Sequence, residues 1–172
     1  MFKNNHLFSS SMKTIIVGGT PCTGKTTLAK RLAKKLNFHY LDVNEIIEKY
    51  NISEGYDKKR DTKIIDTKKL NLALIKEIRN FKQSKEGIII DSHLSHHLPK
   101  KYVDLCIVTK CNLKEMENRL KKKKYSKSKI RENLDAEIFD VCLNEAKENR
   151  HKVIVIDTTK GLNIENISRK IK

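Results

Sequence analysis

The sequence predicts an α/β fold in which a parallel sheet carries helices on both faces. Two observations indicate this fold. Short apolar runs rich in β-branched residues alternate with longer stretches in which apolar residues recur every three or four positions. The chain has 172 residues, a length that suits one domain with one core. Five strands are expected, at residues 13–18, 38–42, 87–91, 103–109 and 152–157.

The helices follow from the apolar repeats between these strands. The first is expected over residues 25–36, because Leu28, Leu32 and Leu36 recur at every fourth position and form one apolar stripe. Residues 127–149 carry the most regular stripe of the chain and predict a long helix. Further helices are expected over residues 43–50, 67–82, 112–122 and 163–171.

The segment between the first strand and the first helix reads Gly-Thr-Pro-Cys-Thr-Gly-Lys-Thr over residues 19–26. This is the pattern G-x-x-x-x-G-K-[ST] in the strand–loop–helix context that identifies a phosphate-binding loop. Gly19 and Gly24 let the backbone curl so that its N–H groups point at phosphate oxygens. Lys25 is expected to reach the β- and γ-phosphates, and Thr26 to offer its hydroxyl to Mg²⁺. The sequence therefore predicts a nucleoside triphosphate site.

A second candidate site follows the strand at 87–91. Three isoleucines lead directly into Asp91, and an apolar strand that ends in a carboxylate can place that acid beside the Mg²⁺ shell, usually through water. His93 follows, and its titration near neutral pH would suit a role in positioning the attacking group or in contacting phosphate. A structural histidine, or a substrate contact without proton transfer, is the alternative. His96 and His97 extend the cluster, but their spacing matches no metal-binding motif.

Two polar stretches are natural candidates for covers that exclude water during phosphoryl transfer. Residues 51–66 lie between two expected helices, and residues 121–127 lie in a basic stretch that runs from Arg119 to Lys129. Cations in such a cover can neutralise charge that develops on the phosphates. A solvated helix end is the alternative for the basic stretch.

The net charge and the cysteine content indicate which partners and which compartment to expect. The formal net charge is +16, which favours polyanionic partners such as RNA, although a general excess of lysine would explain it as well. Four cysteines form no C-x-x-C pair, so a reducing, cytoplasmic compartment is expected. No apolar run is long enough to span a membrane. Residues 1–11 lack the apolar core of a signal peptide and are expected to be a disordered extension.

Taken together, these motifs resemble those of the adenylate kinase isoenzyme 6 family, including its archaeal members. The resemblance covers roughly residues 13–171, and it is more specific than the phosphate-binding loop alone because the motifs occur in the same order. They are the loop Gly19–Thr27, the segment Glu54-Gly55-Tyr56-Asp57 with Asp61 and Asp66, the Asp91-x-His93 motif, and Tyr125 leading into Glu132-Asn133 and Ala136-Glu137-Ile138.

The resemblance implies a single kinase domain over residues 12–172, with the phosphate-binding-loop, nucleoside-monophosphate kinase fold and a five-stranded sheet of order 2-3-1-4-5. It implies transfer of phosphate from ATP to AMP, together with ATP hydrolysis, in maturation of the small ribosomal subunit. Partners would be a ribosomal protein of the uS11 type and small-subunit rRNA. Residues 42–66 would bind the nucleoside monophosphate, and residues 122–132 would form the lid. ATP would contact Cys22, Gly24, Lys25, Thr26, Thr27 and Lys123, with Lys160 as a further candidate near the adenine.

The chain departs from the family pattern at two positions. Cys22 stands where the family usually has glycine, and Lys123-Lys124-Tyr125 stands where it usually has Arg-Gly-Tyr. Loss of the bidentate arginine predicts weak phosphoryl transfer, with ATP hydrolysis as the working reaction.

Two other hypotheses about the function stay open. One is a small-metabolite kinase, for which Arg60 is the single arginine in the acceptor segment 42–66. The other is an ATP-gated assembly factor with little kinase activity.

Overall fold

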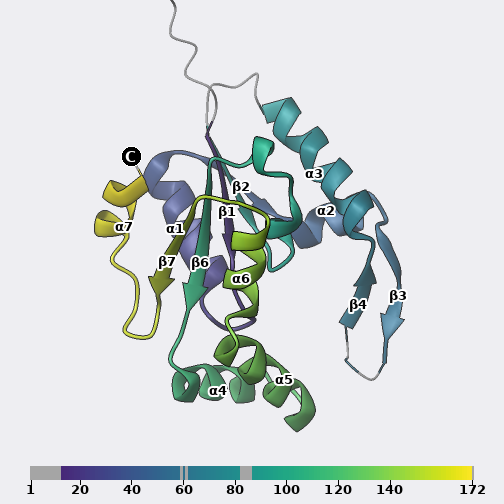
Figure 1. Cartoon of the computed structure of the whole chain (residues 1–172), viewed down its shortest axis with the longest axis vertical. Helices are drawn as coiled ribbons and strands as arrows, with labels where there is room; N and C mark the ends of the chain where they lie inside the picture. Colours follow the sequence, from purple (N-terminus) through teal and green to yellow (C-terminus); the bar gives the residue numbers. More distant parts are fainter. Residues whose placement is uncertain (1–12, 59, 61, 82–86, 172) are drawn as a thin grey trace, which may run out of the picture.

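The core of the protein is a parallel sheet of five strands (Figure 1). The computed structural model describes residues 13–58, 60, 62–81 and 87–171, so the predicted N-terminal extension 1–11 lies outside the described residues. The strands lie in the order β2-β5-β1-β6-β7, which confirms the expected order 2-3-1-4-5 when the strands of this sheet alone are numbered. Their bounds are β1 (Thr14–Gly18), β2 (His39–Asp42), β5 (Ile88–Asp91), β6 (Leu105–Lys110) and β7 (Val153–Asp157).

Helices cover both faces of this sheet because its central strands are apolar on both sides. In β1, the side chain of Ile16 packs on one face, whereas Ile15 and Val17 pack on the other. Helices α1 (Lys25–Leu36) and α7 (Ile164–Ile171) cover the face that holds Ile15 and Val17. Helices α2 (Val43–Lys49), α3 (Thr67–Phe81) and α6 (Val141–Glu148) cover the face that holds Ile16.

The strand register brings polar side chains to one edge of the sheet. Val17 of β1 and Asp42 of β2 both pair with Asp91 of β5, so these three residues lie at the same level near the carboxyl ends of their strands. Ligands of open parallel sheets bind beyond this edge, where the loops that follow the strands converge. The phosphate-binding loop leaves β1 at this edge and leads into α1.

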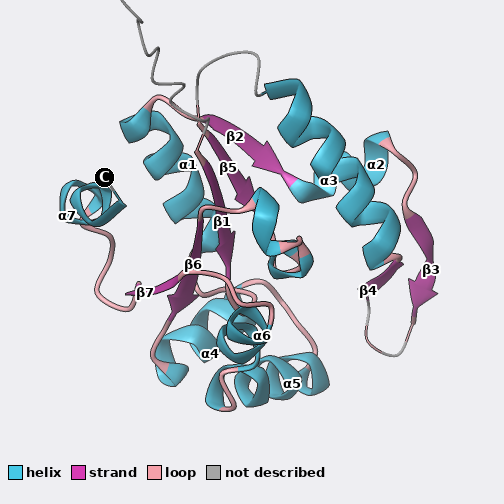
Figure 2. Cartoon of the chain, turned by 45° about the horizontal axis from the view of Figure 1, so that its top comes forward, coloured by secondary structure: helices cyan, strands magenta, loops and turns pink. Residues whose placement is uncertain are grey.

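Two further units lie beyond the carboxyl edge of the sheet. Strands β3 (Ser53–Asp57) and β4 (Thr62–Ile65) pair as an antiparallel hairpin, and helices α4 (Leu113–Lys122) and α5 (Lys127–Ile138) pack on one another. The helix pair has its own small core, formed by Cys111, Met116, Leu120 and Ile130. Figure 2 shows the helix pair beyond the end of β6 and the hairpin beside α3. Two single-turn 3₁₀ helices, η1 (Ser95–His97) and η2 (Lys100–Tyr102), follow β5.

Two predictions from the sequence need correction. Residues 127–149 do not form one helix, because α5 ends at Ile138 and α6 begins at Val141. Asp140 has a left-handed backbone with φ 53°, and the ammonium of Lys110 donates to the carbonyl of Glu137 at 2.9 Å. In a continuous helix, that carbonyl would accept a hydrogen bond from the backbone N–H of residue 141. The ammonium of Lys110, which lies outside the helix, donates to it in place of that N–H.

The polar segment 51–66 is the second correction. The sequence predicts no strand in this candidate cover, whereas most of its described residues pair as β3 and β4. Within the described residues, no helix is both long enough and apolar enough to cross a membrane.

Candidate active site

Threonines at the ends of two strands hold the phosphate-binding loop in place through hydrogen bonds of their hydroxyls. The hydroxyl of Thr109, at the end of β6, lies 2.6 Å from the hydroxyl of Thr23 and donates to the carbonyl of Gly18 at 3.1 Å. The hydroxyl of Thr158, directly after β7, donates to the carbonyl of Thr23 at 2.7 Å. All of these hydroxyls are buried, so the curl of the loop is fixed by bonds that water does not weaken.

Glycine is required at the first position of the loop. Gly19 has φ +131°, and a Cβ there would lie 2.5 Å from the hydroxyl and 2.6 Å from the carbonyl oxygen of Thr109. Gly24, the residue before α1, has φ +90°. Both glycines therefore permit a backbone path that other residues would strain, and their contact with phosphate stays a prediction.

Lys25 begins α1 and lies inside the loop. Its ammonium donates to the carbonyl of Thr20 at 2.9 Å. Burial lowers the pKa of Lys25, while the nearby thiols of Cys142 and Cys22 and the carboxylate of Asp91 oppose that shift. A cation held here lies at the amino end of a helix, where phosphate oxygens are favoured.

A cavity of about 1290 Å³ opens in front of the loop. This volume exceeds the range of about 300–1,000 Å³ that is typical of a site for one small ligand. The cavity extends from the loop to the hairpin β3–β4, where Arg60 and Thr62 line it, and to the helix pair α4–α5. The arrangement provides room for two ligands side by side.

The lining of the cavity is strongly cationic. Seven lysine and arginine residues but only two glutamates line the cavity, so it favours a ligand with several negative charges. The cations come from α1, the hairpin and the helix pair: Lys25, Arg31, Arg60, Arg119, Lys122, Lys123 and Lys129.

Arg119 is held in place by contacts within α4, with the loop and with Thr158. Its guanidinium donates to Glu115 at 2.9 Å, which fixes the side chain along α4. The other nitrogens lie 3.4 Å from the carbonyl of Cys22 and from both oxygens of Thr158. An arginine oriented in this way links α4 to the phosphate-binding loop and can present a planar donor to a phosphate.

Asp91 lies behind the cavity lining. Its side chain is buried, and the hydroxyl of Tyr40 donates to it at 3.0 Å. Desolvation and the nearby carboxylate of Asp91 raise the pKa of Tyr40, so the phenol stays protonated and keeps donating. Thr26, the predicted partner of Asp91 in holding Mg²⁺, is exposed and lines the cavity. Among the described residues, no group of three or more histidines, cysteines and acids could hold a metal ion by itself.

His93 lines the cavity near Lys25. Desolvation lowers the pKa of His93 to about 4, with further contributions from the charges of Lys25 and His97. The expectation that His93 titrates near neutral pH is therefore wrong. A neutral imidazole can still accept or donate a hydrogen bond at a phosphate or at an attacking group.

His96 gives a testable pH dependence. It is buried, and burial, with the neighbouring His97, His93 and His151, lowers its pKa to about 4. Its Nε2 lies 2.9 Å from a Glu145 oxygen, but that side chain is 40% exposed, so solvent weakens its pull on a ring proton.

Between pH 6.5 and pH 4, the unfolded chain binds a proton at His96 that the folded chain does not bind. We therefore expect the free energy of unfolding to fall on the order of 1 to 3 kcal/mol over this range. Urea unfolding at several pH values measures it. The variant His96→Gln should show a flatter dependence, and an equal slope in both proteins would contradict the assignment.

Comparison with known proteins gives consistent matches over most of the chain. A family described as an AAA domain matches residues 15–140. The chain is 39% identical over 157 residues to a Methanocaldococcus jannaschii protein named "Putative adenylate kinase", covering 91% of this chain and 82% of that protein. It is 32% identical over 160 residues to the adenylate kinase isoenzyme 6 homolog of Caenorhabditis elegans, and the match covers 90% of this chain and 85% of that protein.

The chain belongs to the adenylate kinase isoenzyme 6 family. Solved structures confirm the fold that this membership implies. A shikimate kinase from Acinetobacter baumannii, in complex with shikimate, has a TM-score of 0.59 at 16% identity and covers 93% of this chain and 90% of its own. A sugar kinase from a Janibacter species has a TM-score of 0.61 at 18% identity, and the match covers 93% of this chain and 92% of the sugar kinase. The protein is therefore a phosphate-binding-loop kinase of the adenylate kinase type.

The structure brings most of the predicted site residues of this family member to one cavity. Cys22, Gly24, Lys25, Thr26, Thr27, His93 and Lys123 line it. Three others do not. Gly19 and Asp91 are buried behind the lining, and Lys160 is exposed in the turn between Thr158 and Gly161, which do line the cavity.

Sequence reasoning missed the residues that hold the loop in place. Thr109 and Thr158 follow apolar strand runs, as Asp91 does, and this shared position at the carboxyl ends of the strands was the available signal. Thr20 and Glu137 lie within the motifs that carry the family resemblance, but nothing in the local pattern of either residue indicates that the two bond to one another. They matter only because the fold brings them together.

Cys22 gives a testable prediction inside the loop. Its φ is 68°, a left-handed conformation that glycine adopts without strain, and its side chain packs against the core of the helix pair. We expect iodoacetamide to modify Cys22, to weaken nucleotide binding, and to be slowed by bound ATP. Peptide mass spectrometry and calorimetry measure these effects. The variant Cys22→Gly should bind nucleotide after the same treatment, and unchanged ATP affinity in the alkylated protein would contradict the prediction.

Proposed function

We propose that the protein is an Mg-ATP-dependent adenylate kinase that converts ATP and AMP into two ADP and also hydrolyses ATP. The observation that carries the proposal is the shape and charge of the cavity. It holds the phosphate-binding loop at one end and Arg60 of the hairpin at the other, and its volume accommodates two nucleotides. Membership of the adenylate kinase isoenzyme 6 family supports the same acceptor.

In this proposal, ATP binds at the loop and AMP binds beside the hairpin. The backbone of Cys22 and Gly24, with Lys25 and Thr27, holds the phosphates of ATP, and Lys160 lies near the adenine. An oxygen of the AMP phosphate attacks the γ-phosphorus, and the bond from that phosphorus to the bridging oxygen of ADP breaks. Lys25 and Lys123 neutralise the charge that develops during transfer, and neutral His93 hydrogen-bonds at the reacting groups.

The residues at the carboxyl edge fit a magnesium ion. Thr26 offers a hydroxyl oxygen in the cavity, and the buried carboxylate of Asp91, oriented by Tyr40, can hold a water of the ion's shell. Bound there, Mg²⁺ would neutralise charge on the β- and γ-phosphates.

The helix pair α4–α5 would act as the lid over ATP. Its exposed run Lys121–Lys124 supplies cations, but the family's arginine is replaced by Lys123. Lysine lacks the bidentate fork of arginine, so we expect weak transfer relative to hydrolysis. Arg119, which remains and is held at the loop, compensates in part.

The test is an assay of ATP consumption with and without AMP, with products separated by ion-exchange chromatography. Adenylate kinase activity predicts that two ADP form for each ATP consumed when AMP is present. Phosphate release that does not depend on AMP identifies the ATPase reaction. Screening shikimate, cytidylate and other acceptors in the same assay tests a small-metabolite kinase, and a preferred acceptor other than AMP would contradict the proposal.

A second role is favoured by charge, because the net charge of +16 far exceeds what two nucleotides need. We propose that the protein also acts in the maturation of the small ribosomal subunit, with a ribosomal protein of the uS11 type and rRNA as partners, in the cytoplasm or the nucleus. Lid closure would then couple nucleotide to partner affinity. Pull-down of that protein with ATP, with ADP and without nucleotide tests it, and equal binding in all three conditions would count against gating.

A further inference from the structure

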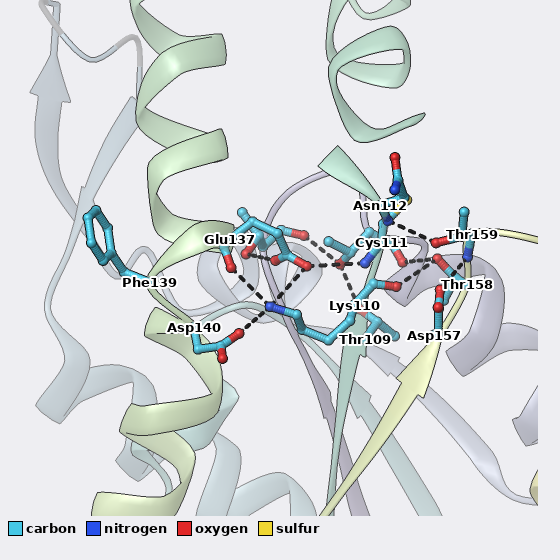
Figure 3. Close-up of polar contacts among 12 residues, drawn as sticks. Thr109, Lys110, Cys111, Asn112, Glu137, Phe139, Asp140, Asp157, Thr158 and Thr159 are labelled. Carbon is cyan, nitrogen blue, oxygen red and sulfur yellow. Dashed lines mark hydrogen bonds and ion pairs between the residues drawn. The ribbon is translucent and has the colours of Figure 1, made fainter. Parts of the chain in front are cut away.

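One buried carboxylate joins three segments of the chain that are far apart in sequence. Glu137, near the end of α5, is 5% exposed. Its two oxygens accept from the hydroxyl of Thr20 at 2.6 Å and from the backbone N–H of Cys111 at 3.1 Å. The ammonium of Lys110 lies 3.4 Å away (Figure 3). Thr20 belongs to the phosphate-binding loop, whereas Lys110 and Cys111 lead from β6 toward α4.

Both ends of the helix pair α4–α5 meet at this carboxylate. The chain enters the pair through Cys111 and Asn112, and Asn112 is itself held by the hydroxyl of Thr159 at 2.8 Å. The chain leaves the pair just after Glu137, where the left-handed Asp140 breaks the helix and pairs with Lys110. Figure 3 shows Lys110 between Glu137 and Asp140, with Phe139 directed away from them. The entry and exit points of the pair are thus one cluster, which is the geometry of a hinge.

The same cluster reaches the lysine that would bind phosphate. The carbonyl of Thr20 accepts from the ammonium of Lys25 at 2.9 Å and from the hydroxyl of Thr23 at 2.7 Å, while the hydroxyl of Thr20 is bonded to Glu137. A phosphate that draws the Lys25 ammonium toward the cavity removes one bond from Thr20. That change acts on a residue bonded to the base of the helix pair, in a buried setting where such bonds are strong.

We propose that Glu137 is a positioning residue that couples occupancy of the phosphate-binding loop to closure of α4–α5 over the cavity, through its bond to Thr20. The inference rests on the proposed function in one respect, namely that α4–α5 is a lid over bound ATP. Glu137 touches no reacting atom in this scheme. It transmits a change at Thr20 to the point where the lid joins the sheet.

The exposed run Lys121–Lys124 provides a readout of closure, because trypsin cleaves after lysine and the two ends of the run, Lys121 and Lys124, lie outside the cavity lining that ATP would contact. The experiment measures the rate of cleavage after Lys121 and Lys124 by mass spectrometry, with and without saturating Mg-ATP, after calorimetry has given the affinity of each protein. Thr20→Val removes the hydroxyl and keeps the shape of the side chain. Thr20→Ser keeps the hydroxyl and is the matched control. Glu137→Gln keeps the shape and removes the charge.

We expect ATP to slow cleavage of the run in the unmodified protein and in Thr20→Ser. In Thr20→Val and in Glu137→Gln, protection by saturating ATP should fall about fivefold or more, the lower end of typical coupling between sites. Thermal unfolding of each variant shows whether it is folded, and Glu137→Gln carries the test if Thr20→Val is not.

The outcomes separate the inference from the function. If the unmodified protein binds no ATP, the proposed function fails and the inference fails with it. If it binds ATP and both variants are protected as well as the unmodified protein is, the inference alone is overturned. Binding without any protection overturns it too, because the pair then does not close. Loss of ATP binding in Thr20→Val but not in Thr20→Ser also overturns it, since the hydroxyl would then belong to the nucleotide site.

Discussion

Replacement of Lys25 by alanine should lower the rate of ATP turnover by roughly a hundredfold or more, the scale of losing one preorganised contact to a transition state. The ammonium of Lys25 lies at the amino end of α1 within reach of the loop, and it already forms a hydrogen bond to the loop carbonyl of Thr20. Phosphoryl transfer spreads charge over the γ-phosphate oxygens, and a fixed cation stabilises that charge more than it stabilises bound ATP.

The measurement is steady-state ATP consumption at saturating Mg-ATP, together with ATP affinity by calorimetry. Lys34→Ala is the matched control, because it removes one exposed cation from the same helix at a position outside the cavity lining. We expect Lys34→Ala to turn over ATP at the normal rate. A Lys25→Ala protein with normal turnover would overturn the assignment of the loop as the donor site.

Replacement of Gly19 by alanine should destabilise the protein by roughly 3 kcal/mol, the sum of overpacking and a strained backbone. The added Cβ would lie 2.5 Å from the hydroxyl and 2.6 Å from the carbonyl oxygen of Thr109, and the carbonyl cannot turn aside without moving β6. Because Thr109 also holds Thr23 and Gly18, the loop should lose its shape. We therefore expect ATP affinity to fall as well.

Gly161→Ala separates the two causes. Gly161 also has a positive φ, +97°, but a Cβ there would meet no atom within 4 Å. Gly161→Ala should therefore lower the free energy of unfolding by about 1–2 kcal/mol, from backbone strain alone. Urea unfolding of both variants gives the difference. Equal losses would mean that the contact with Thr109 does not decide the choice of glycine.

The prediction of one helix over 127–149 shows where local pattern is insufficient. The apolar stripe is regular across the whole stretch, and nothing in it marks Phe139 or Asp140 as a break. At the break, the carbonyl of Glu137 accepts from the ammonium of Lys110 on β6 as well as from the backbone N–H of Asp140. A partner 27 positions away in sequence therefore stabilises this helix end, and periodicity cannot detect such a partner.

The histidines show a similar limit in their chemistry. The Asp91-x-His93 spacing indicates that His93 lies near the phosphate site, and the cavity lining agrees with it. Its state of protonation depends on desolvation and on Lys25, which together hold its pKa at about 4. A residue type suggests a typical pKa, but the surroundings in the folded protein set the actual one.

By itself the sequence determined the five-stranded α/β fold, the phosphate-binding loop and the family, because strand runs, helix stripes and loop glycines depend on neighbouring residues. The tertiary structure alone decided how the loop is held and how the lid region joins it. Thr20 and Glu137 are 117 positions apart, and Thr23 and Thr109 are 86 apart. Their hydrogen bonds exist only because parallel strands end at one edge of the sheet and bring distant loops into contact.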